Sequence, residues 1–338
     1  MQRATIADVA ARAGVTKSTV SHALSGKRPV APETRDRIEQ AIVELGYSPN
    51  QVAQRLASGR SRTIGFVYPL YTPQVGGLEM KFIAGAATVI NQANYAFVLL
   101  THPERQPDNL QRFVEGGLLD GVILMQVRLR DQRVELLQRA GVPFVLVGRC
   151  CDNAGLTFID LDVDAALNRC VAHLVELDHT ALAYLHQDDP EFGFAARATQ
   201  AYADACRRFG LPVVMATTGL SVESGQHAMT ALLARRPETT GVIVWNDIAG
   251  WGAAQAGQAQ GRRIPGDLSI ICFDHTVITD IVPFNPTVID IRAEEMAAEA
   301  ARMLIALLED QPLAQHQMLV APRFSVGDTT APRRPHAY

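Results

Sequence analysis

The chain of 338 residues is long for one domain and suits a small N-terminal domain followed by a larger two-lobed core. Its formal charge of −4 combines a basic first 60 residues, with nine Lys/Arg against five Asp/Glu, and an acidic remainder, which confines attraction for phosphate to the N-terminal end. Five cysteines without a Cys-x-x-Cys pair, no apolar run of the ~18 residues that a membrane span needs, and no signal-peptide segment predict a cytoplasmic protein with reduced thiols.

Residues 5–25 (TIADVAARAGVTKSTVSHALS) are predicted to form two short helices around a tight turn. Thr5 can cap the first helix, with Asp8 returning the hydrogen bond, and Gly14 ends it. Thr16 can cap the second helix, one face of which is polar and free of acids: Lys17, Ser18, Ser21, His22 and Ser25. This pattern is typical of a helix-turn-helix that reads a major groove, and the alternative is a helical hairpin that is merely solvated on its polar side.

A third helix is predicted from Pro32, which suits a first helical turn, to Gly46, which suits a helix end. Its apolar face consists of Ile38, Ala41, Ile42 and Leu45. Three helices within about 45 residues form a headpiece too small to be very stable by itself.

The chain continues as GYSPNQVAQRLASGRSRTIGFV, and together with the preceding segment it resembles the headpiece and hinge of the LacI/GalR family of bacterial transcription regulators. The resemblance is dense to about residue 65 and weaker motifs extend it over essentially the whole chain. It implies a hinge helix within residues 50–60, too short to be stable alone, in which Leu56 wedges between base steps of the minor groove. The alternative is that Leu56 is an ordinary apolar linker residue.

The residues predicted to contact DNA are drawn from the two helices of the motif, the third helix and the hinge. They are Thr5, Thr16, Lys17, Ser18, Thr19, Ser21, His22, Thr34, Tyr47, Asn50, Gln54 and Leu56.

From Thr63 onward the pattern changes to short β-rich apolar runs that alternate with helical stretches, which is typical of parallel sheets with crossover helices. The predicted strands are Ile64–Tyr68, Phe97–Leu100, Val122–Met125, Phe144–Val147, Leu182–Leu185, Val213–Ala216, Val242–Trp245 and Leu268–Phe273. The predicted helices are Met80–Gln92, Asn109–Gly117, Val134–Ala140, Val163–Leu177, Ala195–Phe209, Ser224–Ala234, Ile248–Gln260 and Glu294–Leu308. We therefore expect an α/β protein in which two lobes of parallel sheet flanked by helices, as in periplasmic binding proteins, follow the headpiece.

The expected boundaries are a headpiece at residues 1–49, a hinge at 50–61, a core at 62–330 and a tail at 331–338. Lobe 1 should comprise about 62–160 and 291–322, and lobe 2 about 161–290 and 323–330, because the last helix returns to the first lobe in the family.

Paired lobes of this type bind a small ligand beside the carboxyl ends of their strands. Polar and aromatic residues follow several predicted strands, and the expected effector-binding residues are Tyr71, Gln126, Arg149, Phe192, Arg197, Trp245, Asn246 and Asp274. The resemblance implies effector contacts for Asn246, Asp274 and Arg197 in particular. The alternatives are a capping role for Asp274, a surface or interlobe ion pair for Arg149 and Arg197, and core packing for the aromatic residues.

The chain departs from the family pattern at several of these places. His22 stands where most members have an arginine, and the "GFDD" motif reads Cys272-Phe273-Asp274-His275. Arg197 lies one residue further from the following aromatic than usual, which rotates it by about 100° on a helix. The ligand pocket is therefore expected to be remodelled, and the identity of a particular sugar cannot be transferred from the family.

No catalytic motif or metal-ligand spacing occurs, so an enzyme is not expected and neither is a cofactor. A solute-binding protein without a regulatory role is the alternative, and it is disfavoured by the headpiece and the lack of an export signal. The expectation is a repressor that binds pseudo-palindromic double-stranded operator DNA as a homodimer and responds to a small effector, a sugar or sugar derivative. The Pro-rich tail after Thr330 is too short for a tetramer-forming helix.

Overall fold

The computed structural model describes residues 4–25, 28–47, 61–69, 76–101, 108–274 and 284–333. The chain divides into two compact units, Met1–Ser61 and Arg62–Tyr338.

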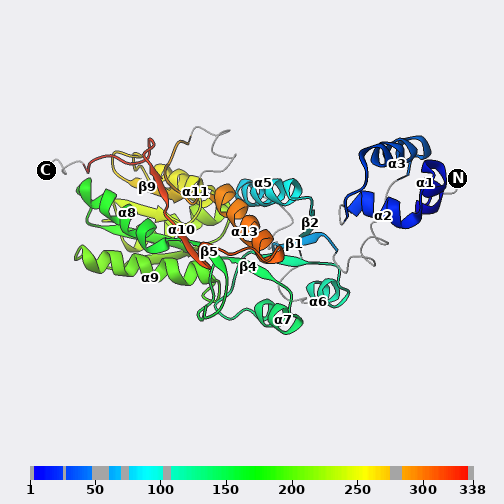
Figure 1. Cartoon of the computed structure of the whole chain (residues 1–338). Coiled ribbons are helices and arrows are strands. Elements are labelled where there is room, and N and C mark those ends of the chain that lie inside the picture. Colours follow the sequence, from blue (N-terminus) through cyan, green and yellow to red (C-terminus); the bar gives the residue numbers. More distant parts are fainter. Residues whose placement is uncertain are drawn as a thin grey trace. The chain divides into compact units, whose positions relative to one another are not determined.

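The first unit contains the three predicted helices, α1 (Ile6–Ala13), α2 (Lys17–Ser25) and α3 (Pro32–Leu45) (Figure 1). The predicted capping box at the start of α1 is confirmed, since the Thr5 amide donates to Asp8 Oδ2 at 2.8 Å and the Asp8 amide donates to Thr5 Oγ1 at 3.4 Å. Gly14 and Gly46 end α1 and α3 in the left-handed conformation, with φ of 66° and 58°. The sequence signals therefore place both ends of α1 correctly.

A single small core holds the three helices together. The buried residues are those of the predicted apolar stripes together with one position of α2: Val9, Ala10, Ala13, Val20, Ile38 and Ala41. Because Val20 faces this core, the opposite face of α2 is left at the surface.

The second unit has two six-stranded sheets, and each is the centre of one lobe. The lobe 1 sheet has the order β11-β5-β4-β3-β1-β2 and consists of β1 (Thr63–Val67), β2 (Ala96–Leu100), β3 (Gly121–Leu124), β4 (Phe144–Val147), β5 (Phe158–Leu161) and β11 (Gln317–Val320). Helices α5 (Gly77–Gln92) and α13 (Ala293–Leu308) lie side by side on one face (Figure 1), and α6 (Asp108–Glu115) and α7 (Gln132–Ala140) cover the other.

The lobe 2 sheet has the order β12-β10-β9-β8-β6-β7, in which only the β10–β12 pair is antiparallel. Its strands are β6 (Leu182–Gln187), β7 (Met215–Thr218), β8 (Gly241–Val244), β9 (Ser269–Phe273), β10 (Thr287–Asp290) and β12 (Arg323–Ser325). Helices α8 (Val163–Glu176) and α9 (Gly193–Arg208) cover one face, and α10 (Val222–Arg235) and α11 (Asp247–Ala259) cover the other. The predicted class, two lobes of largely parallel sheet flanked by helices, is confirmed.

The sequence patterns missed four strands, and three of these lie where the chain passes from one lobe to the other. The crossings follow β5, β10 and β11, and strand β12 then completes the lobe 2 sheet. Each of the four is only three or four residues long, and β11 and β12 lie at sheet edges and are only partly buried. Strands β5 and β10 each contain an aspartate that interrupts the apolar run, and the edge strands β11 and β12 contain at most three apolar residues in succession, so neither pair shows the pattern of a buried strand.

Close packing of α10 on α11 sets the position of the first turn of α11. A Cβ atom at Gly225 would lie 2.0 Å from the Ala249 carbonyl oxygen, and one at Gly252 would lie 1.9 Å from that of Val222. Only glycine permits this approach. The helix is thereby held with its N-cap, Asn246, at the end of β8.

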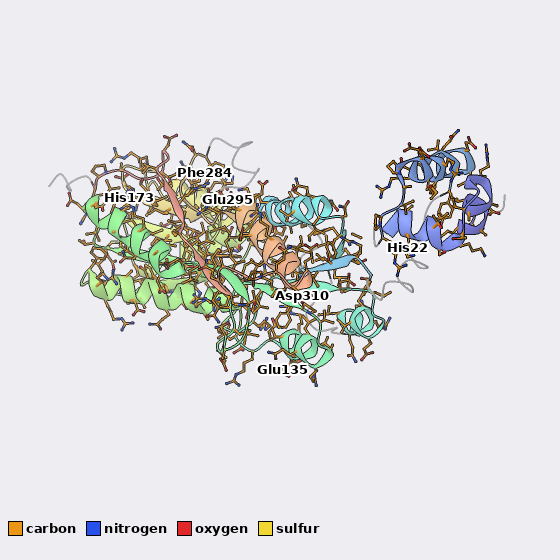
Figure 2. The ribbon with its side chains drawn as sticks, in the orientation of Figure 1. His22, Glu135, His173, Phe284, Glu295 and Asp310 are labelled. Carbon is orange, nitrogen blue, oxygen red and sulfur yellow. The ribbon has the colours of Figure 1, made fainter. Side chains whose placement is uncertain are left out.

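A buried histidine pair ties the C-terminal segment to lobe 2 and should make the core sensitive to acid. Burial lowers the pKa of His179, whose Nδ1 lies 3.0 Å from Thr240 Oγ1 and whose Nε2 lies 3.0 Å from the Ala331 carbonyl oxygen. Burial also lowers the pKa of His173 on α8 (Figure 2). In the unfolded chain both side chains titrate near the ordinary value of 6.5. The unfolded state therefore binds protons first as the pH falls.

We therefore expect the contribution of His179 to stability to be fully present above about pH 6.5 and to be lost as the pH falls below it. The melting temperature of His179→Asn should lie below that of the wild type at about pH 7.5, and the gap should narrow at about pH 5.5. Calorimetry at both pH values measures the gap, and a gap that stays constant would contradict the argument.

Candidate functional site

The polar face of α2 is the candidate DNA-reading surface. Lys17, Ser18 and Ser21 are exposed and His22 is half-buried on the same helix (Figure 2), whereas Val20 is fully buried against the headpiece core. This face offers hydroxyl groups, one ammonium group and one imidazole, and no carboxylate. Such groups can bond base edges and phosphates.

Several of the predicted DNA contacts also have structural partners within the headpiece. Thr5 Oγ1 donates to Asp8 Oδ2 at 2.7 Å, and this bond lowers the pKa of Asp8. Thr16 Oγ1 accepts from the Thr19 amide at 3.2 Å and lies 2.8 Å from Thr19 Oγ1. Tyr47 is half-buried and packs against the core. Thr5 and Thr16 therefore stabilise the first turns of their helices, and Tyr47 contributes to the packing of the headpiece.

The remaining DNA-contact predictions fall into two groups. Thr34 is half-buried in the first turn of α3. Asn50, Gln54 and Leu56 lie outside the described residues, as does the predicted hinge helix.

A cleft of about 740 Å³ in the second unit is lined by residues of both lobes. Tyr68 and Gln126 follow β1 and β3 in lobe 1, while Asp188, Asn246 and Asp274 follow β6, β8 and β9 in lobe 2. The carboxyl ends of neighbouring parallel strands meet at one edge of a sheet, which is why residues so distant in sequence share one cavity.

The lobe 1 wall is a hydrogen-bonded chain of three side chains. Gln126 Nε2 donates to the Tyr68 hydroxyl at 3.1 Å, and that hydroxyl donates to Glu79 Oε1 at 3.3 Å. Gln126 itself has a left-handed φ of 53°, which is uncommon outside glycine and clusters at functional sites. Its Oε1 atom is buried and has no hydrogen-bond partner among the described residues.

The lobe 2 wall places two of the predicted effector contacts at strand ends. Asn246 is 6% exposed, and its Oδ1 atom caps α11 by accepting from the Ala249 amide at 2.7 Å. Asp274 is 3% exposed, has a left-handed φ of 59°, and its Oδ1 atom pairs with Lys81 Nζ of α5 at 3.1 Å. The Asp274–Lys81 pair joins lobe 2 to lobe 1 at the cleft.

Two predicted aromatic contacts also line the cleft, and both make structural contacts. Trp245 Nε1 donates to the Thr218 carbonyl oxygen at 3.2 Å. Phe192 packs on Phe194 with ring centroids 6.0 Å apart. Tyr71 lies outside the described residues.

Arg149 and Arg197 are not among the residues that line the cleft; both bind Asp160, which does line it. Arg149 Nε lies 2.9 Å from Asp160 Oδ2, Arg197 Nη2 lies 3.2 Å from the same oxygen, and Arg197 Nη1 donates to the Arg149 carbonyl oxygen at 3.0 Å. Arg149 follows β4 of lobe 1 and Arg197 belongs to α9 of lobe 2. The structure thus places them in the interlobe ion pair that was the alternative to effector binding.

Burial governs the charges of this cluster. Asp160 is 4% exposed, and burial raises its pKa although both arginines act in the opposite direction. Burial likewise lowers the pKa of Arg197, against the attraction of Asp160. Such a cluster ties the two lobes together mainly because each member depends on the others for compensation of its charge.

A second set of contacts between the two lobes lies next to this cluster. Arg128 pairs with Asp189 at 3.3 Å, and the Leu129 amide donates to the Glu191 carbonyl oxygen at 2.8 Å. The Gly193 amide donates to the Val127 carbonyl oxygen at 2.9 Å.

Sequence reasoning missed several residues of the cleft, including Tyr68, Glu79, Asp160, Gln187 and Phe194. Tyr68 and Gln187 could have been found, because each lies at the end of a predicted or observed strand, as the predicted contacts Gln126 and Asn246 do. Glu79 could not, because it belongs to the first turn of α5 and nothing in its local pattern distinguishes it from a solvated helix residue.

The structure covers residues 4–25, 28–47, 61–69, 76–101, 108–274 and 284–333. No group of His, Cys, Asp or Glu side chains there has the arrangement of a metal site. None of the helices described is long and apolar enough to cross a membrane.

In comparisons with known proteins, one family model matches within each of the two units. Residues 5–50 match the family of bacterial regulatory proteins named after lacI, and residues 171–330 match the periplasmic binding protein-like domain. The HTH-type transcriptional regulator AglR of Rhizobium meliloti (strain 1021) is 30% identical over 276 residues, which cover 80% of this chain and 76% of AglR. The HTH-type transcriptional regulator CelR of Thermobifida fusca is 28% identical over 312 residues, covering 90% and 92%.

Solved structures agree with these matches. The structure of a transcriptional regulator CelR–cellobiose complex is 25% identical, with a TM-score of 0.74 over 97% of this chain and 100% of that chain. The lac repressor dimer bound to operator and the anti-inducer ONPF has the same fold, with a TM-score of 0.85 at 23% identity over 98% and 100%. The chain therefore belongs to the lacI family of bacterial regulatory proteins.

Proposed function

We propose that this protein is a transcription regulator, a repressor, that binds a pseudo-palindromic operator and changes its affinity when a small molecule occupies the cleft. The observation that carries the proposal is the presence in one chain of a helix-turn-helix with a polar, acid-free face on α2 and of a cleft between two lobes. The headpiece reads DNA and the cleft receives the effector. Lobe closure around the effector then alters the spacing of the headpieces.

The relatives support each half of this proposal. AglR and CelR are named as transcriptional regulators, CelR is described in complex with cellobiose, and the lac repressor is described as a dimer on its operator. By analogy, the present protein acts as a homodimer in the cytoplasm, where the operator DNA is, and its effector is a sugar or sugar derivative. Two headpieces related by two-fold symmetry suit two half-sites of one operator.

The domain roles follow from this proposal. Residues 1–49 form the headpiece, 50–61 the hinge, and 62–330 the effector-binding and dimerisation core, with the lobes divided near residues 160, 290 and 322. Binding rather than catalysis is proposed for the cleft. Its candidate contacts are Gln126, Phe192, Trp245, Asn246 and Asp274, which line it, and Tyr71. The chain is proposed to need no cofactor.

Binding-site selection from random double-stranded DNA tests the DNA-reading role with the full-length protein and no ligand. We expect a pseudo-palindrome, and we expect His22→Arg to change the preference at one base pair of each half-site by about 1–3 kcal/mol, because arginine grips guanine with two bonds and neutral imidazole has one donor and one acceptor.

A matched control replaces Arg35, an exposed residue of α3 outside the predicted contacts, with lysine, and its selected sequence should equal that of the wild type. Selection of identical sequences by His22→Arg and the wild type would show that α2 is not the reading helix. Failure of the wild type to select any sequence would reject the proposed function as a whole.

A further inference from the structure

The charges that line the cleft are almost all negative. Six acidic residues line it, namely Glu79, Asp160, Asp188, Asp189, Asp247 and Asp274, whereas His227 is the single described lining residue that can become cationic. The described lining of the cleft therefore contains no arginine or lysine, the residues with which proteins bind phosphate and carboxylate groups.

The nearest basic residues already have acidic partners. Lys81 pairs with Asp274 at 3.1 Å, Arg128 with Asp189 at 3.3 Å, and Arg149 and Arg197 share Asp160. An incoming anion would have to compete with these carboxylates for the same cations. Glu79 and Asp188 would add repulsion, and like charges in a partly desolvated cavity repel strongly.

Amide atoms without hydrogen-bond partners indicate which uncharged groups the cleft can bind in place of an anion. Asn246 Nδ2, Gln126 Oε1 and Gln187 Oε1 are buried and have no hydrogen-bond partner among the described residues, and Asn246 itself is 6% exposed. All three side chains line the cleft. Buried polar atoms of this kind normally find a partner, so a ligand that supplies both donors and acceptors would satisfy them.

The size of the cleft and its aromatic wall suit a ligand of more than one sugar ring. A cleft of about 740 Å³ lies in the upper part of the range of about 300–1,000 Å³ that small-ligand sites occupy. Phe194 at the cleft packs edge-on against Phe273, with centroids 5.9 Å apart, so part of the wall is a rigid aromatic surface. Sugar rings present apolar C–H faces to such surfaces while their hydroxyls bond polar atoms.

From these observations we infer that the cleft selects an uncharged polyhydroxylated ligand of more than one ring and rejects phosphorylated or carboxylated derivatives of the same sugar. This inference rests on the proposed effector role of the cleft and narrows it to one class of ligand. Rejection comes from the acidic lining, and binding comes from the hydroxyl-compatible amides and carboxylates.

The test is a thermal-shift and calorimetric comparison of matched pairs with the full-length protein. The panel contains neutral mono-, di- and trisaccharides, with cellobiose, trehalose, sucrose and maltose among them, together with their 6-phosphates and the corresponding uronic acids. At least one neutral disaccharide or trisaccharide should bind, at least about a hundredfold more tightly than its phosphorylated or carboxylated derivative. Raising the salt concentration should narrow this ratio, because screening weakens repulsion.

Two double variants that remove the same number of negative charges distinguish the effect of the cleft lining from the effect of the overall charge of the core. Glu79→Gln with Asp188→Asn removes two negative charges from the cleft and should lower the selectivity ratio at least about tenfold. Glu135→Gln with Glu223→Gln removes two exposed charges from α7 and α10, where neither residue lines the cleft, and should leave the ratio unchanged. Glu135 lies on the surface of α7 (Figure 2).

Three results would overturn the inference: an anionic derivative that binds the wild type as tightly as its neutral parent, a panel without any neutral binder, or equal ratios for the two double variants. Operator selection is measured without ligand, so its outcome tests the proposed function and does not depend on the outcome of the sugar-binding comparison. A protein that selects an operator and prefers a sugar phosphate would keep the proposed function and lose this inference.

Discussion

Replacing both Arg149 and Arg197 with methionine is expected to destabilise the core by about 3–5 kcal/mol, because the carboxylate of Asp160 would remain buried without a compensating charge. Asp160 is 4% exposed, and both arginines reach its Oδ2 atom. Methionine keeps most of the side-chain volume of arginine, so the loss of stability would result from the missing charge and not from a cavity. Urea unfolding at neutral pH measures the difference.

Adding Asp160→Asn to this double variant should recover at least half of the lost stability, since the buried group is then neutral. Arg302→Met removes an exposed pair with Glu299 and should cost less than about 1 kcal/mol. If the double variant were as stable as the wild type and yet lost its response to ligand, Arg149 or Arg197 would be an effector contact after all, and the interlobe role would be abandoned.

Replacing Asp274 with asparagine is expected to abolish the response to ligand while leaving operator binding without ligand nearly unchanged. The carboxylate can accept hydrogen bonds from two neighbouring hydroxyls, whereas the asparagine amide keeps one acceptor oxygen and has a donor in place of the other. One hydroxyl is then left without its acceptor in a desolvated cleft, which costs about 1–3 kcal/mol. Asparagine is preferable to alanine because residue 274 has a left-handed φ of 59°, which asparagine tolerates well. Calorimetric titration with the tightest-binding neutral sugar of the panel measures the loss of affinity.

Lys81→Met is the matched control, because it removes the interlobe ion pair with Asp274 and keeps the carboxylate. This variant should still bind the sugar, and its melting temperature shows how much the pair contributes to the folded core. Undiminished sugar affinity in Asp274→Asn would reject the effector role. A large fall in melting temperature without ligand would instead favour the alternative that Asp274 is a structural residue.

The sequence by itself determined the headpiece almost completely, because every signal there is local. Thr5 and Asp8 form the predicted capping box, Gly14 ends α1, and Val20 turns inward so that Lys17 and Ser21 face outward. Capping, helix ends and a 3.6-residue period involve residues within four positions of one another. The resemblance to one family followed from the same short stretch.

The class of the core was also within reach of the sequence, since buried parallel strands appear as short apolar runs between helical patterns. The strands at the crossings between the lobes could not be predicted from the sequence. Strand β5 joins the lobe 1 sheet beside β4 and β11, but Asp160 interrupts its apolar residues, so they do not form the continuous run that marks a buried strand. Whether such a segment pairs depends on partners far away in the sequence.

Strand ends predicted which residues could reach the cleft, and tertiary structure alone decided which of them do. Gln126, Asn246 and Asp274 line the cavity, whereas Arg149, which follows β4, and Arg197, which the family resemblance suggested, bind Asp160. A buried carboxylate competes for any cation within reach, and only the packing of α9 against lobe 1 brings Arg197 there. The acidic character of the cleft emerged in the same way, because Glu79 and Asp188 are ordinary charges in the sequence and become neighbours of one cavity only when two lobes fold together.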